Sequence, residues 1–162
     1  MWLWGIVVAI ALQRLIELVI ARRNTARLLA QGGREHAPGH YPVIVVLHAA
    51  WLASMVVFVP TNTPPDFFWL ALLVLMQVAR FWVLASLGSR WTTRIIVMPD
   101  APLVARGPYR WMRHPNYAVV VIELIALPMV FGAVWIALVF TVLNAAVLTW
   151  RIREEDRALG RG

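Results

Sequence analysis

The chain has 162 residues, of which 61% are hydrophobic and 14% charged, and its mean hydropathy is +0.72. A soluble domain is about half apolar, so this composition excludes water as the main solvent and indicates an integral membrane protein. At about 20 apolar residues per crossing, residues 1–162 form one domain of at most five or six membrane helices. The sequence has no cysteine, which excludes disulfides and thiolate metal sites.

The net charge of +7 comes from arginine, because every basic residue of the chain is an arginine. Strong positive charge can signal nucleic-acid binding. Here the arginines flank apolar runs, which favours a role in orienting the chain in the bilayer. We therefore expect no nucleic-acid partner, and membrane lipids as the surroundings.

The first membrane helix is expected from Met1 to about Ile20. It lacks the short apolar region and small-residue cleavage site of a secretory signal, so it is expected to be retained. Arg14 and Glu17 are three residues apart and share one face of this helix. They form either a mutually satisfied pair or part of a functional site. A polar stretch, 22–40, follows.

The second membrane helix is expected over residues 42–59 and the third over residues 67–87. The turn-rich loop between them, 60–66, contains no basic residue. Arg80 lies inside the third helix. An arginine at that depth should face a partner, a cavity or the membrane interface instead of lipid.

Residues 88–116 form a long polar connection, the least membrane-like part of the chain. The next apolar run, 117–150, is too long for one crossing and is interrupted by Pro128 and Gly132. We interpret it as a tight hairpin of a fourth and a fifth helix. The charged tail, 151–162, should extend the fifth helix into water.

The arginines are distributed unevenly between the two ends of the expected bundle. Of fifteen, four lie in 22–40, five in 88–116 and four in 151–162, and the two opposite loops contain none. The positive-inside rule places these three segments in the cytoplasm and the N-terminus outside. Five crossings satisfy this arrangement, so the fold is predicted to be an all-α membrane protein of five helices.

A candidate chemical site lies in residues 107–117, Gly-Pro-Tyr-Arg-Trp-Met-Arg-His-Pro-Asn-Tyr. Such a segment can simply anchor a helix among lipid headgroups. His114 favours a functional interpretation, because Pro115 fixes the backbone at a helix start and restricts the residue before it. Glu123 follows inside the next helix, and a carboxylate within the bilayer is a functional candidate by default.

The second cluster is Arg-Ile-Arg-Glu-Glu-Asp at 151–156, where the fifth helix leaves the membrane. A charge run at a helix end is more typical of a solvated face. However, both clusters adjoin the ends of the same predicted hairpin and can meet over one cavity. Carboxylates there can accept hydrogen bonds from ribose hydroxyls, and Arg113 and His114 can bind a ligand carboxylate.

These two motifs together resemble the isoprenylcysteine carboxyl methyltransferase family, membrane enzymes that use S-adenosylmethionine. A wider pattern resembles a bacterial branch that acts beside type III polyketide synthases and O-methylates alkylpyrones or alkylresorcinols. That pattern comprises Arg23-Asn24, His40-Tyr41-Pro42, His48, Arg90-Trp91-Thr92 and Glu123. The resemblance implies a lipophilic acceptor entering from the bilayer of a bacterial cytoplasmic membrane.

The resemblance also implies roles for individual residues. Arg113, His114 and Tyr117 would hold the methionyl part of S-adenosylmethionine. The remaining cofactor-binding residues are expected to be Tyr109, Pro115, Glu155 and Asp156, the last two on the ribose. For a phenol near its ordinary pKa of about 10, Glu123 or His48 is the candidate catalytic base. No metal site is expected.

Glu123 lies nine residues beyond His114, about 13 Å along a helix axis, which places it with the acceptor instead of the cofactor. The sequence departs from the family pattern at Ala118-Val119, where a glycine is common, and at Glu155-Asp156, where a second glutamate is common. These departures affect the shape of the substrate pocket and the reach of the second carboxylate.

Two alternatives to O-methylation of a polyketide-derived hydroxyl remain open. A prenylcysteine carboxyl methyltransferase would require Arg151 or Arg94 to clamp a free carboxylate of its acceptor. A non-catalytic module that binds lipid or anchors a subunit would have no need of S-adenosylmethionine.

Overall fold

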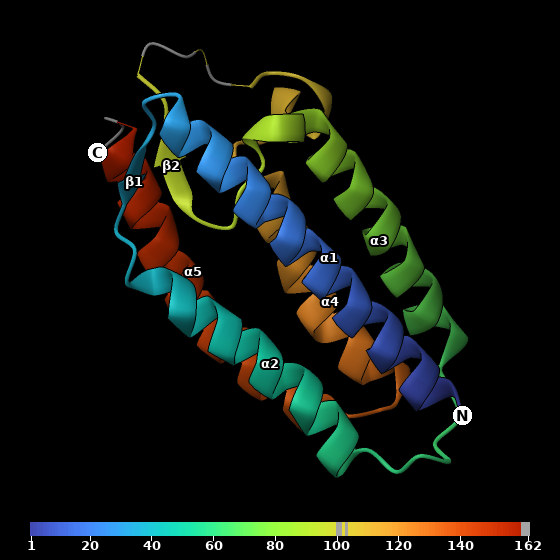
Figure 1. Ribbon diagram of the computed structural model, residues 1–162. Helices are drawn as coiled ribbons and strands as arrows, with labels where there is room; N and C mark the ends of the chain where they lie inside the picture. Colours follow the sequence, from blue (N-terminus) through green and yellow to red (C-terminus); the bar gives the residue numbers. More distant parts are fainter. Residues whose placement is uncertain (100–101, 103, 160–162) are drawn as a thin grey trace.

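The computed structural model describes residues 1–99, 102 and 104–159 of the chain. The predicted site segment 107–117 lies within the described residues, and the tail 151–162 is described to residue 159. The elements, shown in Figure 1, are α1 (Trp2–Ala30), β1 (Arg34–His36), α2 (His40–Phe58), α3 (Phe67–Leu87), η1 (Gly88–Arg90), β2 (Ile95–Val97), η2 (Gly107–Arg110), α4 (Pro115–Val130) and α5 (Val134–Ala158).

The mostly helical architecture is confirmed, but the predicted end of the first helix is wrong. α1 continues through the polar stretch to Ala30. The extension is held by Asn24, whose side-chain amide donates to the backbone carbonyls of Gly88 (3.3 Å) and Trp91 (2.9 Å). The helix ends at Ala30, and Gly32, two residues later, has a φ of +88°, the left-handed conformation that suits glycine after a helix.

Two short strands lie within the segments that were predicted to be polar connections. β1 and β2 pair antiparallel, with Glu35 opposite Ile96. The bidentate ion pair between Arg94 and Glu35, at 2.9 and 3.1 Å, adds to this contact. The strand pair joins the segment after α1 to the segment after α3, beside the end of α5 (Figure 1).

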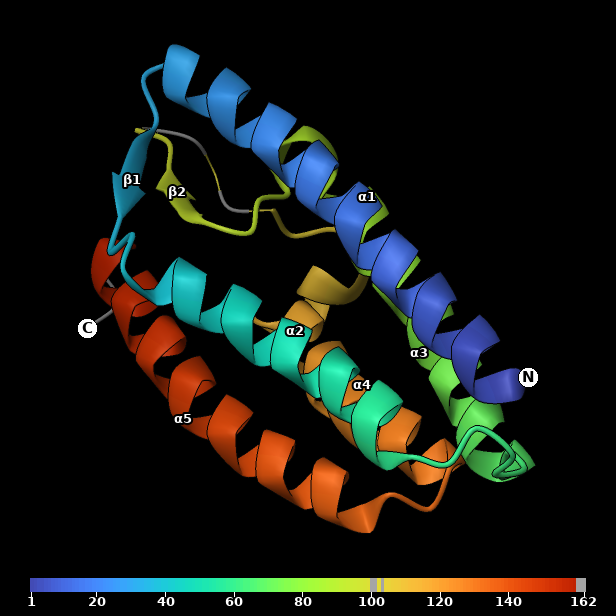
Figure 2. The ribbon, with the colours of Figure 1, turned by 60° about the horizontal axis from the view of Figure 1, so that its bottom comes forward.

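The helices pack as a bundle in which α4 contacts both α3 and α5, and α2 contacts α5 (Figures 1 and 2). The apolar core lies toward the N-terminal end of α1, opposite the strands. Its fully buried members include Leu3 of α1, Trp51 and Met55 of α2, and Leu127 of α4. The other half of the bundle is therefore left for polar contacts.

The turn between α4 and α5 lies at the core end of the bundle. Pro128 is inside the last turn of α4, and its carbonyl accepts from the backbone N–H groups of Phe131 and Ala133. The backbone N–H of Asp66, in the loop before α3, donates to the Val130 carbonyl at 2.7 Å. The loops without arginine thus lie together, at the end away from β1 and β2.

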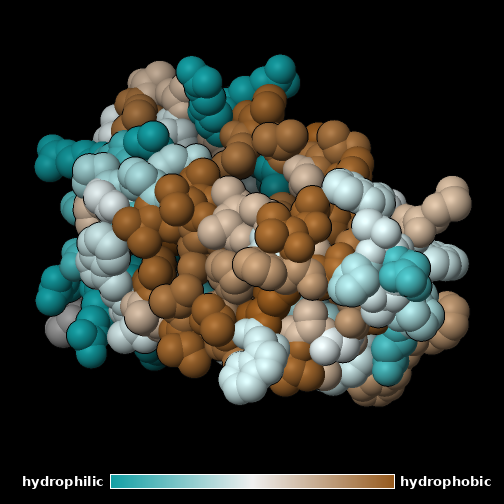
Figure 3. All heavy atoms as spheres, turned by 90° about the horizontal axis from the view of Figure 1, so that it is seen from below, coloured by the Kyte–Doolittle hydropathy of each residue, from teal (hydrophilic) through white to brown (hydrophobic). Residues whose placement is uncertain are grey.

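The outer surface of the bundle is apolar. Figure 3 shows hydrophobic side chains across the middle of one face, with more polar side chains at its margins. Large exposed apolar residues occur along α1, α2, α3 and α5. These four helices are long and apolar enough to cross a membrane, whereas α4 has 16 residues and is shorter. This surface suits lipid as the solvent.

Candidate functional site

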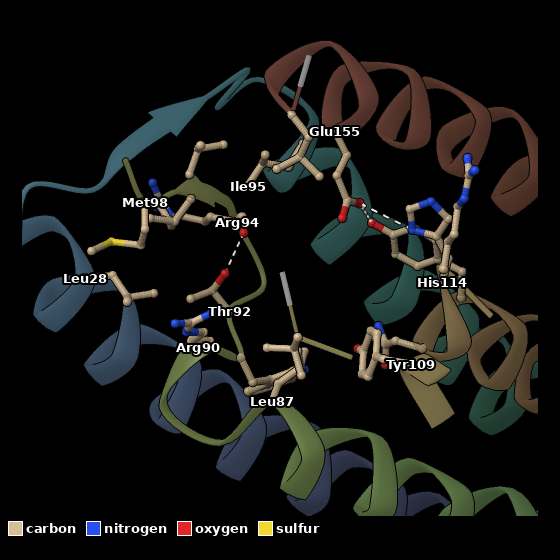
Figure 4. Close-up of a pocket in the computed structure, with 18 of the residues that line it drawn as sticks. Leu28, Leu87, Arg90, Thr92, Arg94, Ile95, Met98, Tyr109, His114 and Glu155 are labelled. Carbon is tan, nitrogen blue, oxygen red and sulfur yellow. Dashed lines mark hydrogen bonds and ion pairs between the residues drawn. The ribbon is translucent and has the colours of Figure 1, made fainter. Parts of the chain in front are cut away.

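A pocket of about 420 Å³ opens at the end of the bundle where β1 and β2 lie. It is lined by the end of α1, the η1–β2 segment, η2, the start of α4 and the end of α5. Figure 4 shows Glu155, from α5, directed toward His114 at the start of α4, with Tyr109 beside them. The two sequence motifs therefore meet over one cavity.

The segment before α4 is fixed against the end of α3. Gly107 has a φ of +58°, and a β-carbon there would lie 2.1 Å from the Ser86 Oγ, so only glycine fits this turn. The neighbouring Arg106 Nε donates to the Ser86 carbonyl at 2.7 Å. Pro115 then occupies the first position of α4, where its missing N–H costs nothing. These contacts fix both ends of the segment that carries the pocket residues Tyr109, Arg113 and His114.

Five of the seven expected cofactor-binding residues line the pocket: Tyr109, Arg113, His114, Tyr117 and Glu155. Tyr117 donates a hydrogen bond to Glu155 Oε2. The His114 and Tyr117 rings stack with centroids 5.0 Å apart, and His114 Nδ1 lies 3.8 Å from Glu155 Oε2. Pro115 and Asp156 are not among the lining residues. Pro115 is buried at the helix start, and Asp156 is the next residue along α5 from Glu155.

The protonation of Tyr109 is set by its surroundings. Burial raises the pKa of the Tyr109 phenol well above its ordinary value, and the Glu155 carboxylate raises it further. The phenol is therefore neutral at physiological pH and can donate a hydrogen bond into the pocket. Asn116, which the sequence interpretation did not select, also lines the pocket.

Arg151 lines the pocket but is held by protein groups. Its Nε donates to the Tyr117 hydroxyl at 2.8 Å, and its Nη1 contacts His40 Nε2 at 3.0 Å and the Thr93 carbonyl at 2.8 Å. Arg94 is likewise engaged, since its guanidinium pairs with Glu35 and lies over the Tyr41 ring. Both arginines expected to clamp an acceptor carboxylate thus already have partners.

Glu123 belongs to a charge cluster inside the bundle, which we define as Arg14, Glu17, Arg80 and Glu123. Glu123 Oε2 accepts from Arg14 (2.5 Å) and Arg80 (3.1 Å), and Arg80 also donates to both oxygens of Glu17. The Arg14–Glu17 pair foreseen from their spacing forms at 3.0 Å. Arg80 was expected to face a partner, and within this cluster it has two, Glu17 and Glu123.

His48, the other candidate base, is on α2 and is not among the residues lining the pocket. Its Nδ1 lies 2.9 Å from the Ile44 carbonyl of the preceding turn. A carbonyl only accepts, so Nδ1 carries the proton and the lone pair is on Nε2. Glu123, by contrast, also receives a hydrogen bond on Oε1, from Gln77 at 3.0 Å.

The pocket residues fit the cofactor implied by the sequence resemblance. The volume lies within the range of about 300–1,000 Å³ that small-molecule sites occupy. Within the described residues, the buried Asn116 Oδ1 has no hydrogen-bond partner and Arg113 makes no ion pair. An amino acid carboxylate suits Arg113, an ammonium suits Asn116, and ribose hydroxyls suit Glu155.

The bundle and its pocket define the class of protein. It is an integral membrane protein with a pocket at one end of an apolar helix bundle. A model of the isoprenylcysteine carboxyl methyltransferase (ICMT) family matches residues 69–161, which include both pocket motifs. The chain belongs to this family of membrane methyltransferases.

Two bacterial relatives resemble the chain over nearly its whole length. One, named uncharacterized protein YpbQ, from Bacillus subtilis (strain 168), is 39% identical over 160 residues, covering 96% of this chain and 95% of the relative. An uncharacterized protein from Haemophilus influenzae (strain ATCC 51907 / DSM 11121 / KW20 / Rd) is 25% identical over 151 residues, 90% of this chain and 88% of that protein.

Proposed function

We propose that this protein is an S-adenosylmethionine-dependent O-methyltransferase that acts in the membrane on a lipophilic acceptor. The observation that carries the proposal is the meeting of Arg113, His114 and Tyr117 with Glu155 around one pocket. The cofactor would supply a methyl group on a sulfonium, and its transfer to an acceptor oxygen breaks the carbon–sulfur bond and leaves a thioether.

The side chains of the pocket would bind and orient the polar cofactor. Arg113 would pair with its carboxylate, and Glu155 would accept hydrogen bonds from its ribose hydroxyls. Tyr117 holds Glu155 Oε2, which leaves Oε1 for the ligand. Because methyl transfer requires in-line approach of the acceptor, this alignment and the exclusion of water would be the main catalytic contributions.

The proposed acceptor is the hydroxyl of an alkylresorcinol or an alkylpyrone, its alkyl chain remaining in lipid. Prenylcysteine carboxylate is the second candidate of the same family. The contacts of Arg94 and Arg151 favour the hydroxyl acceptor, because both guanidiniums are already engaged within the protein. The third candidate function is a non-catalytic lipid-binding module, which would not bind S-adenosylmethionine.

A phenolic acceptor must lose its proton, and two residues are proposed for this step. His48 Nε2 has a lone pair for the proton, because Nδ1 is committed to the Ile44 carbonyl. Glu123 can act only by giving up a contact with Arg14, Arg80 or Gln77. If Glu123 is the base, Glu123→Gln lowers turnover by roughly 10² or more while S-adenosylmethionine affinity stays unchanged.

The acceptor assignment is tested by turnover assays on defined substrates in detergent. An alkylresorcinol, an alkylpyrone and a prenylcysteine analogue are each supplied to the wild type, His48→Gln and Glu123→Gln proteins. We expect the wild type to methylate the first two, and His48→Gln to lose methylation of the alkylresorcinol, whose phenol needs a base. Turnover of the prenylcysteine analogue alone would select the second candidate. Wild-type rates in both variants would refute the base assignments.

The cofactor site is tested by calorimetry of S-adenosylmethionine binding. Arg113→Ala, His114→Ala and Glu155→Ala should each weaken binding, whereas Arg157→Ala, an exposed arginine paired with Glu154, should not. Each lost charge-assisted contact is worth about 1.5–3 kcal/mol, or at least tenfold in Kd. Unchanged affinity in all three pocket variants would refute the site, and no binding by the wild type would favour the non-catalytic module.

We further propose five crossings of a bacterial cytoplasmic membrane, with α4 as the fourth and the α4–α5 pair as a hairpin. The positive-inside rule then places the pocket and the C-terminus in the cytoplasm and the N-terminus outside. A reporter fused after Gly162 should behave as cytoplasmic. Periplasmic activity of that fusion would overturn the orientation.

A further inference from the structure

His40, the first residue of α2, is fully buried at the edge of the pocket, with 0% of its surface exposed. Its ring lies between the loop after β1 and Arg151 of α5. Nδ1 contacts the Ala37 carbonyl, and Nε2 contacts Arg151 Nη1 at 3.0 Å. Both ring nitrogens are therefore used, although nothing in the pocket chemistry described above depends on this histidine.

These partners determine the protonation state of the ring. A guanidinium can only donate, so His40 Nε2 must accept with its lone pair. A carbonyl can only accept, so His40 Nδ1 must carry the proton and donate to Ala37. His40 is thus a neutral imidazole in a single tautomer, fixed from both sides.

Arg151 also donates a second hydrogen bond, toward the pocket. Arg151 Nε donates to the Tyr117 hydroxyl at 2.8 Å, and that hydroxyl donates to Glu155 Oε2. The Tyr117 oxygen receives one hydrogen bond and gives one, so its proton is directed at the carboxylate. The donors therefore run outward from Arg151 on two sides, through Tyr117 to Glu155 and through His40 to the Ala37 carbonyl.

The loop before α2 is shaped to present that carbonyl. Ala37 has a φ of +47° and is the non-glycine residue with positive φ within the described part of the chain. This left-handed conformation is unfavourable for alanine. The ring also stacks edge-on against Trp150, with centroids 6.2 Å apart, so packing and hydrogen bonds fix the same orientation.

We propose that His40 is a positioning residue of the cofactor site, which holds Arg151 and thereby aims Tyr117 and Glu155 at the ligand. The identification of the ligand as S-adenosylmethionine rests on the proposed function. The hydrogen-bond chain itself belongs to the protein without ligand, and it can be tested separately.

Two substitutions of His40 separate its two hydrogen bonds. Glutamine places an amide oxygen near the position of Nε2 and can still accept from Arg151. Asparagine places its amide near Nδ1 and can still donate to Ala37, but it is too short to reach Arg151. The matched control is His36→Asn, because His36 lies nearby on β1 and does not line the pocket.

Calorimetry with S-adenosylmethionine should show a Kd raised about tenfold or more in His40→Asn, the effect of losing one charge-assisted hydrogen bond. His40→Gln should stay within about threefold of the wild type, and His36→Asn should not change. Equal weakening in His40→Gln and His40→Asn would show that His40 only fills space and would overturn the proposal.

A second measurement needs no ligand. Nitrogen-15 NMR of histidine-labelled wild-type protein in detergent should show His40 with a protonated Nδ1 and an unprotonated Nε2. Arg151→Lys should shift the Nε2 resonance. The opposite tautomer, or an Nε2 resonance that does not respond to Arg151→Lys, would refute the proposed hydrogen bonds of His40. This result does not depend on whether His40→Asn folds. If the wild type binds no S-adenosylmethionine but shows the expected tautomer, the proposed function is refuted and the hydrogen-bond network of His40 is still supported.

Discussion

Replacing Glu123 with glutamine tests whether the charge cluster stabilises the bundle as a balanced unit. The cluster contains two arginines, Arg14 and Arg80, and two glutamates, Glu17 and Glu123. Glu123 is 1% exposed and Arg80 is 6% exposed, so water screens their charges little. Glu123→Gln keeps the shape of the side chain but leaves one positive charge without a partner.

The loss of stability in Glu123→Gln distinguishes a loss of hydrogen bonds alone from a loss of charge balance. Glu123 accepts three hydrogen bonds, and at about 0.6 kcal/mol each inside a membrane their loss alone would cost about 2 kcal/mol. Breaking a buried ion pair costs about 3–5 kcal/mol, because an uncompensated charge is left behind. If charge balance matters, the cost of Glu123→Gln should exceed the hydrogen-bond value.

The assay is reversible unfolding in mixed micelles, followed by circular dichroism. The double variant Arg14→Gln/Glu123→Gln restores neutrality and should be more stable than the sum of the two single changes predicts, by 1 kcal/mol or more. The single and double variants also serve the turnover assay, because they separate loss of fold from loss of chemistry. Additive effects, or a Glu123→Gln cost no larger than the hydrogen-bond value of about 2 kcal/mol, would refute the reasoning.

Four further substitutions test local backbone geometry by the same unfolding assay. Gly107→Ala should lower the free energy of unfolding by more than about 2 kcal/mol, because its β-carbon would clash with Ser86. Gly32→Ala has open space and should lower it only by the backbone strain of about 1–2 kcal/mol. Equal losses of stability in the two variants would contradict the clash. Asp66→Ala removes the N-cap side chain that accepts hydrogen bonds from backbone N–H groups of α3, and it should lower the free energy of unfolding by about 0.5–2 kcal/mol. An unchanged stability would show that this cap does not stabilise the protein. Ala37→Gly should be neutral or stabilising by up to about 1 kcal/mol, and a loss of that size would show that the loop is unstrained.

The positions of the membrane helices could be predicted because apolar runs report them directly. The end of α1 was missed because that criterion stops at the charges after Ile20. A different signal continues past them: the buried face of α1 recurs at alternating intervals of four and three residues, which is the period of a helix packed in a bundle. Its members are Leu3, Val7, Ile10, Arg14, Glu17, Ala21, Asn24 and Leu28.

The strand pair could not be predicted, because β1 and β2 are separated by two whole helices in the sequence. Three-residue strands have no periodicity that distinguishes them from loop, and their stability comes from pairing with each other. The partners of Glu123 pose the same difficulty. Its depth in α4 could be calculated from the helical rise, but that Arg14 and Arg80 would both point at it depends on how three helices pack.

The second pocket motif shows how far spacing alone can discriminate between neighbouring residues. Arg151 and Glu155 of α5 line the pocket together with Leu159, the residue that follows the helix. They are spaced four residues apart, so they follow one face of the helix. Asp156 is one residue further than Glu155 and is turned by about 100° from it on a helix of 3.6 residues per turn. Helical spacing alone thus explains why Glu155 lines the pocket and Asp156 does not. Because Glu155 lines the pocket and Asp156 does not, we expect the shorter side chain of Asp156 to affect the proposed cofactor site less than the family resemblance implies.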